Sequence, residues 1–252
     1  MAVYVNTNVS SLNGRRYLNN VQNQLNTTYQ RLSSGMRINS AKDDAAGLQI
    51  ADRLTTQING LNQGNRNTND GIALAQTIEG ALDETSSMLQ KIRTLAVQSA
   101  NGTNTADDRK AIDTEAKALQ DEITRIAKQT KFGGKTVLVG ATAGSIYNTT
   151  SNPKGTVGQL IFQVGANKGD EISFDVANFT FDGIHSQAGK NTAAFNNSNL
   201  ILSTASGAKA VISLMDSMIA KVDAQRSGLG AIQNRLESSI RNQSNVSANQ
   251  AD

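Results

Sequence analysis

The fold of this chain is decided by one stretch, residues 54–96, which reads LTTQINGLNQGNRNTNDGIALAQTIEGALDETSSMLQKIRTLA. Its apolar residues recur at steps of three and four, with a polar gap at Asn65 and Thr68. Such spacing places side chains on one face of a helix. At 1.5 Å per residue, a helix from about Ala41 to about Ser99 would be roughly 85–90 Å long, which is a rod rather than the core of a compact domain.

The same periodicity appears upstream and downstream of this stretch. An N-terminal stripe is formed by Leu18, Val21, Leu25 and Leu32, with Tyr29 on the same face. After a turn at residues 101–104, Thr105 and the acids that follow it predict the N-terminus of a third helix, whose apolar residues keep a heptad spacing. From about Ala205 a heptad pattern returns, with Gln225 as a polar insertion.

The middle of the chain follows a different pattern. Phe132-Gly-Gly-Lys135 is a turn, and residues 157–164 and 171–181 are rich in β-branched and aromatic side chains, which predicts two strands. Asn, Gly, Ser and Thr dominate residues 141–155 and 186–199, so we expect two exposed loops.

These patterns predict a mainly α fold, a long antiparallel helical rod or bundle with a small β-hairpin-containing insert. Two helical arms separated by an insert bury their stripes most economically against each other. The stripes are narrow and interrupted by Asn, Gln and Ser, which suits helices that also pack laterally against other copies. A monomeric spacer or a long coiled coil fits the periodicity almost equally well.

Composition excludes many functions. The 252 residues include no Cys, no Trp, one Pro and one His. Disulfides, thiolate metal sites and multi-histidine metal centres are therefore excluded. The net charge of +3 comes from nearly balanced counts without long runs of like charge, so we expect no nucleic-acid binding. No apolar stretch is long enough to span a bilayer, and no cleavable signal peptide is evident, so we expect no membrane insertion.

Few residues suggest chemistry. Asp43 and Asp44, with Asp52 beyond, could suggest a cation site, but adjacent carboxylates point about 100° apart on a helix. We interpret them as first-turn acids. His185, near Asp182, lies in an expected loop and is expected to be solvated. We therefore predict no enzyme activity, no metal and no cofactor. The hydroxyl clusters Thr149-Thr150-Ser151 and Ser203-Thr204 are possible acceptors of O-linked sugars.

Four ordered segments carry a family resemblance: RLSSGMRINSAKDDAAGLQIADR at 31–53, LQKIRTLAVQSAN at 89–101, FQVGAN at 162–167 and LGAIQNRLE at 229–237. They closely resemble bacterial flagellins. The resemblance implies a structural subunit of the flagellar filament that self-assembles by lateral and axial packing of helical rods, for swimming motility. It also implies an extracellular location reached without a cleaved signal peptide.

The resemblance divides the chain into four parts. Residues 1–44 resemble the inner-core helix and connector, and 45–134 the first part of the rod-like domain. Residues 135–203 resemble a short β and loop variable region, and 204–252 the C-terminal rod helix. A terminal core helix that flagellins normally carry is absent, so the N-terminal stripe, its self-assembly seam, lacks its partner. We therefore expect the purified 252-residue chain to assemble poorly or not at all.

The family also implies partners. These are other copies of the chain, the flagellar export apparatus, hook-associated proteins and the vertebrate Toll-like flagellin receptor; the export chaperone docks mainly on the absent end. The receptor-binding residues carried over by the resemblance are Gln90, Lys91, Leu95, Gln98, Ile112 and Glu115. Receptor-active flagellins usually have Arg where Lys91 stands, so we expect weakened but retained signalling.

Two other interpretations of these residues stay open. Without the resemblance, Leu95 and Ile112 could be core residues, and Lys91 with Glu115 a solvated pair. The alternative function is a truncated flagellin that acts as a soluble ligand of the receptor, or as a surface adhesin, rather than polymerising.

Overall fold

The computed structural model describes residues 8–147, 157–189, 193–196 and 199–251. The helices are α1 (Val9–Ser34), α2 (Ala45–Ala100), α3 (Ala106–Gln129), α4 (Phe181–Ala188) and α5 (Ala205–Ala251). The strands form antiparallel pairs, β1 (Lys131–Phe132) with β2 (Lys135–Thr136), β3 (Gly158–Gln163) with β4 (Glu171–Val176), and β5 (Phe195–Asn196) with β6 (Asn199–Leu200). The predicted mainly α fold is confirmed.

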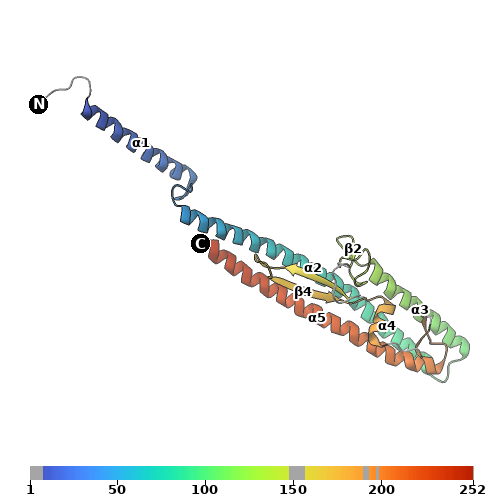
Figure 1. Cartoon of the computed structure of the whole chain (residues 1–252). Coiled ribbons are helices and arrows are strands. Elements are labelled where there is room, and N and C mark those ends of the chain that lie inside the picture. Colours follow the sequence, from blue (N-terminus) through green and yellow to red (C-terminus); the bar gives the residue numbers. More distant parts are fainter. Residues whose placement is uncertain (1–7, 148–156, 190–192, 197–198, 252) are drawn as a thin grey trace. The chain divides into compact units, whose positions relative to one another are not determined.

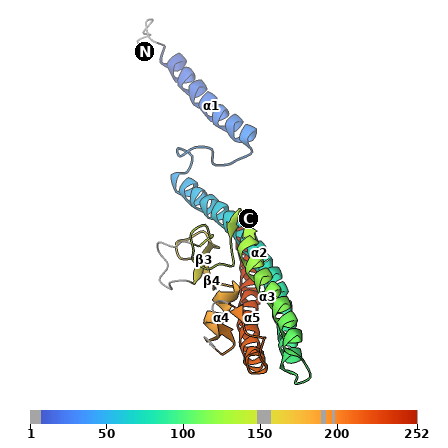
Figure 2. The same cartoon turned by 90° about the vertical axis from the view of Figure 1, so that its right-hand side faces the viewer.

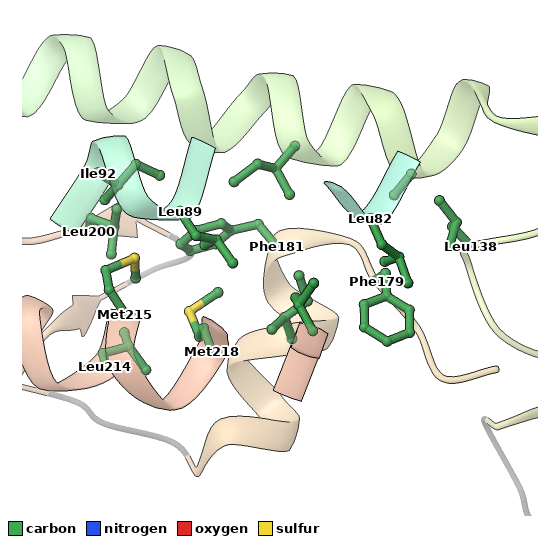
Figure 3. Packing of buried hydrophobic residues seen from close by; sticks show 14 of the residues in the cluster. Leu82, Leu89, Ile92, Leu138, Phe179, Phe181, Leu200, Leu214, Met215 and Met218 are labelled. Carbon is green, nitrogen blue, oxygen red and sulfur yellow. The ribbon is translucent and has the colours of Figure 1, made fainter. Parts of the chain in front are cut away.

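The chain divides into two compact units, one ending at Ile58 and the other starting at Asn59. In the second unit, α2, α3 and α5 lie side by side, with α3 and α5 antiparallel to α2 (Figures 1 and 2). Their facing stripes form one core that includes Leu82, Leu89 and Met215, all fully buried (Figure 3). Burying one such side chain stabilises the fold by about 1.5–3 kcal/mol. The rod therefore has its core along helix stripes, as the spacing predicted.

The turn between α2 and α3 is fixed by caps at both of its ends. Thr105 and Asp108 form a capping box, in which the Thr105 Oγ1 accepts from the Asp108 N–H at 3.2 Å and the Asp108 Oδ2 accepts from the Thr105 N–H at 2.9 Å. Hydrogen bonds from Thr105, first its hydroxyl and then its N–H, lower the pKa of the Asp108 carboxyl. Arg109 donates to the carbonyls of Ser99 and Asn101, at 3.0 and 2.9 Å, which closes the C-terminus of α2. The N-cap predicted at Thr105 is confirmed.

The β3–β4 hairpin is the predicted strand pair, in a register that places Leu160 opposite Phe174. The predicted second strand was too long, because β4 ends at Val176 and Phe181 instead begins α4. Thr180 is the N-cap of this helix and accepts from the Gly183 N–H at 3.2 Å. Capping chemistry therefore overrides the β-propensity of the segment.

Two expected loops are only partly loops. Within 186–199, α4 continues to Ala188 and the β5–β6 pair follows. Within 141–155, Tyr147 is buried, and its hydroxyl donates to the Val137 carbonyl at 2.5 Å. Burial raises the pKa of Tyr147. The cluster Thr149-Thr150-Ser151 lies outside the described residues, whereas Thr204 accepts from the Gly207 N–H at the start of α5.

His185 is not a solvated loop residue, and that expectation is wrong. It lies in α4 and is buried, and its ring packs on Phe195 with centroids 4.2 Å apart. Phe181 and Ile184 of the same helix are also buried. This amphipathic helix has only two turns and contains Gly and Ser, so its apolar spacing is too short to be recognised from the sequence.

Two polar residues on the helix stripes, Gln225 of α5 and Asn67 beside the polar gap in α2, bind the β3–β4 hairpin. The Gln225 Nε2 donates to the Asp175 carbonyl at 2.9 Å, and the Asn67 Nδ2 donates to the Gln163 carbonyl at 3.0 Å. Gly64 lets the backbone at Val164, which follows β3, lie directly against α2. A Cβ at this position would lie 2.2 Å from the Val164 carbonyl oxygen. These interruptions therefore have an intramolecular role, in addition to any lateral packing between copies.

The first unit contains α1 and a connector. Gly35 ends α1 in a left-handed conformation at φ 69°, and Asp43 holds the connector that follows. Hydrogen bonds from the Asn39 N–H and the Arg31 guanidinium lower the pKa of Asp43. The Asp44 Oδ1 accepts from the Gly47 N–H at 2.9 Å, as a residue at a helix N-terminus does. These two acids therefore make a loop contact and a cap, rather than both lying in the first turn.

Candidate functional site

The N-terminal stripe is an exposed apolar surface. Leu18, Val21, Leu25 and Leu32 are 70, 58, 50 and 78% exposed. No residue of α1 is buried in the structure as described. Isolated helices are only marginally stable in water, and most helical stability in proteins comes from packing an amphipathic face. The stripe therefore has the character of a surface that another helix covers.

A second candidate surface, the α2–α3 patch, consists of Gln90, Lys91, Gln98 and Glu115. All four side chains are exposed. The Lys91 Nζ lies 3.1 Å from a carboxylate oxygen of Glu115, so two residues from neighbouring antiparallel helices meet. An exposed pair of this kind contributes about 0–1 kcal/mol and is screened by salt. A partner could therefore replace this contact at little cost.

The structure separates the other two predicted receptor residues from this patch. Leu95 is 7% and Ile112 is 8% exposed, and both belong to the core. Each lies one turn from another buried residue on its helix, Ile92 for Leu95 and Ala116 for Ile112. Their side chains therefore pack in the hydrophobic core that α2 and α3 share. The core interpretation, which the sequence left open, holds for these two.

Sequence reasoning missed a polar clamp at the segment that leads into α5. The Ser99 Oγ donates to the Leu202 carbonyl at 2.6 Å, and the Leu202 N–H donates to the Asp113 Oδ1 at 3.1 Å. Lys117 pairs with the same carboxylate at 2.7 Å. One signal was available, because Asp113 lies beside Ile112 in the helix stripe yet carries a charge that would need a partner if buried. The identity of that partner could not be read from spacing.

Two ion pairs connect α2 to α5. Arg93 lies 2.6 Å from Asp216, and Arg226 lies 2.9 Å from Asp83. In both pairs the aspartate is exposed and the arginine is half-buried, so solvent screens the pairs and they contribute to the register between the helices more than to stability.

The described residues contain no cluster of the kind that holds a metal ion. Among them, no group of three or more His, Asp or Glu side chains is placed to hold a metal ion. His185, the one histidine of the chain, is buried against Phe195 rather than presented in a cleft. Nor does any helix in the described ranges have the length and apolar character to span a membrane. The candidate sites are the two exposed surfaces described above, the N-terminal stripe and the α2–α3 patch.

Comparisons with known proteins indicate the family of this chain. Residues 5–143 match the family model described as bacterial flagellin N-terminal helical region. Flagellin A of Vibrio anguillarum is 50% identical over 72% of this chain and 44% of its own length. Polar flagellin C of Vibrio parahaemolyticus is 36% identical over 99% of this chain and 87% of its own length. A crystal structure of Bacillus cereus flagellin has a TM-score of 0.53 at 30% identity, covering 71% of this chain and 88% of that one.

The relatives differ in length from this chain. The chain spans less than half the length of several of the curated relatives that it matches, including Flagellin A of Vibrio anguillarum.

Proposed function

The chain belongs to the bacterial flagellin family, and from this premise we propose that it is a structural subunit of the bacterial flagellar filament. In this role it self-assembles outside the cell by lateral and axial packing of helical rods, and serves swimming motility. Family membership supports a structural rather than an enzymatic protein. It favours a filament subunit over a chain that acts only as a soluble ligand or an adhesin.

The observation that carries this proposal is the exposure of the N-terminal stripe. The four aliphatic side chains of this stripe are half or more exposed. Contact of so much apolar surface with water raises the free energy of the isolated chain. Burial of each one contributes about 1.5–3 kcal/mol. Contact with neighbouring subunits supplies that burial in a polymer, and the second unit presents a preformed rod.

The test is incorporation into filaments in cells that also express another, filament-forming flagellin. A stripe variant replaces Leu18, Val21, Leu25 and Leu32 with Gln, which keeps helix propensity and removes the apolar face. A control variant replaces Asn13, Asn19, Asn20 and Asn23, also exposed in α1, with Gln. Mass spectrometry of sheared filaments measures incorporation.

The wild-type chain and the control variant are expected in the filaments, and the stripe variant only in the medium. A wild-type chain that is exported but never enters filaments would overturn the proposal. Equal incorporation of the stripe variant would show that this face is not the assembly surface. For export and anchoring we extend the proposal to the flagellar export apparatus and hook-associated proteins as partners.

A second role is favoured by the α2–α3 patch, in which Gln90, Gln98 and Glu115 match the receptor motif that the family resemblance implies, and Lys91 stands where Arg is usual. We propose that it contacts the vertebrate Toll-like flagellin receptor. Lys91 weakens this contact, because Lys lacks the planar guanidinium with which Arg forms two hydrogen bonds at once. Lys91→Arg is expected to increase signalling in a receptor reporter assay. The matched Lys110→Arg, exposed on α3 outside the patch, is expected to have no effect. No gain from Lys91→Arg would contradict the assignment.

A further inference from the structure

Three Asn-Gly pairs occur in the chain, Asn13-Gly14, Asn59-Gly60 and Asn101-Gly102. In such a pair the backbone nitrogen of Gly can attack the Asn side-chain carbonyl carbon, because Gly has no Cβ to obstruct the approach. Sequence alone makes the three pairs chemically equivalent. What distinguishes them is whether the local backbone lets the two atoms meet.

Two of the pairs lie inside helices. Asn13-Gly14 is in α1 and Asn59-Gly60 is in α2. A helix fixes ψ near −42° and engages the Gly N–H in a hydrogen bond to the carbonyl four residues back. Gly60 is also packed, since a Cβ there would lie 2.7 Å from the Ala166 Cβ. Attack at Asn59 therefore requires local unfolding of α2.

The third pair lies outside a helix. Asn101 and Gly102 follow the last residue of α2, and both are exposed. A Cβ built on Gly102 would meet nothing within 4 Å. The Asn101 Oδ1 accepts a long hydrogen bond from the Thr103 N–H at 3.5 Å, so the side-chain amide is turned toward the peptide units that follow it.

We propose that Asn101 is a site of spontaneous deamidation, because its Asn-Gly pair lies in a turn rather than inside a helix. The Gly102 backbone nitrogen forms a bond to the Asn101 Cγ and gives up its proton, while the side-chain amide leaves as ammonia. The cyclic imide that results takes up one water molecule and opens to aspartate or isoaspartate. Atoms balance with water as the only co-reactant, and no oxidant or reductant takes part.

The product changes the end of α2 and the edge of the α2–α3 patch. The carbonyl of Asn101 accepts from Arg109 at 2.9 Å, and in the isoaspartate form this group becomes a free carboxylate. Either product adds negative charge at a helix C-terminus, where the dipole disfavours it. Gln98 of the patch is one turn away, and its carbonyl accepts from the Asn101 and Asn104 nitrogens. The modification therefore alters a surface that the family resemblance assigns to a partner.

The test follows all three pairs in one folded sample. The full chain is incubated at mildly alkaline pH in water enriched in heavy oxygen, then digested with trypsin. Trypsin places the three pairs in separate peptides. Asn13-Gly14 lies in the peptide that ends at Arg15, Asn59-Gly60 in the peptide 54–66, and Asn101-Gly102 in the peptide 94–109. Deamidation is measured by mass, with one solvent oxygen incorporated. Asn101 is expected to react at least about tenfold faster than Asn59, because attack at Asn59 must await local opening.

Two controls make the result decisive. In denaturant the rates at Asn59 and Asn101 are expected to converge, since the structural protection is gone. Gly102→Ala is expected to slow Asn101 in the folded chain and to leave Asn59 unchanged, whereas Gly80→Ala, also in open space, changes neither. Equal rates at Asn59 and Asn101 in the folded chain would overturn the proposal. An unchanged Asn101 rate in Gly102→Ala would overturn the mechanism.

Discussion

Helices α1 and α5 carry the same kind of apolar stripe, yet their side chains are in opposite environments. Leu18 and Leu25 in α1 are exposed, whereas Met215 and Val222 in α5 are fully buried. Both stripes follow the same three- and four-residue spacing. The difference teaches that periodicity defines a face of a helix and says nothing about what covers it. In α5 the cover is intramolecular, and for α1 we propose that it is another subunit.

The largest expected effect is on the buried stripe. Leu89→Ala removes a fully buried side chain from the centre of the core and is expected to lower the free energy of unfolding by about 2–5 kcal/mol. Leu18→Ala in α1 removes an exposed side chain and is expected to change it by less than about 0.5 kcal/mol. Urea unfolding followed by circular dichroism measures both. Equal effects would remove the distinction between the two stripes.

The next effect concerns how closely the hairpin approaches α2. Gly64→Ala places a Cβ against the Val164 backbone and is expected to destabilise the second unit by about 1–3 kcal/mol. Gly80→Ala, in the same helix but in open space, is expected to stabilise it by about 0.5–1 kcal/mol. The opposite signs can be read from thermal unfolding of the two variants. A stabilised Gly64→Ala would mean that the hairpin does not dock there in solution.

A further effect tests the polar clamp on Leu202. Asp113→Ala leaves the buried Leu202 N–H without its acceptor and is expected to cost about 1–3 kcal/mol. Asp121→Ala, exposed on the same helix, serves as the control and is expected to have little effect. Hydrogen exchange of the Leu202 amide reports the loss directly. Unchanged protection in Asp113→Ala would show that the clamp does not hold this segment.

The smallest expected effect is a pH-dependent change in the stability of the connector in the first unit. Hydrogen bonds to the Asp43 carboxylate lower its pKa in the folded connector, so the connector is stabilised while the carboxylate is charged. That contribution is present above the ordinary aspartate pKa and is lost as pH falls through the lowered value. Amide chemical shifts of Asn39 and Ser40 are expected to follow this titration, and Asp43→Asn is expected to abolish it. Shifts that titrate normally in the variant would assign the effect to another acid.

Several elements could be predicted from sequence because their signals are local. The N-cap at Thr105 is one example, since the hydroxyl and Asp108 lie within one turn of each other. The β3–β4 strands were found from composition and flanking turns, whereas α4 was missed, because two helical turns are too short for a periodic signal. The burial of His185 was missed for the same reason.

The predicted receptor residues also include some whose environment follows from local sequence and others whose environment depends on tertiary packing. Exposure of Gln90 and Lys91 agrees with their polarity, but burial of Leu95 and Ile112 depends on which face of α2 and α3 meets the core. The Ser99 and Asp113 clamp joins residues about a hundred positions from Leu202. No local pattern specifies such a pair, because backbone groups of any residue are equivalent until the chain brings them together.

The sequence by itself determined that this protein is built from long helices with apolar stripes and one short β insert, because hydrophobic spacing and capping act within a few residues. Only the tertiary structure decided which stripe is covered, why amides such as Gln225 interrupt it, and which of three Asn-Gly pairs lies outside a helix. Burial and hydrogen bonding between distant segments exist only after the helices have packed, and they set the environment of each side chain.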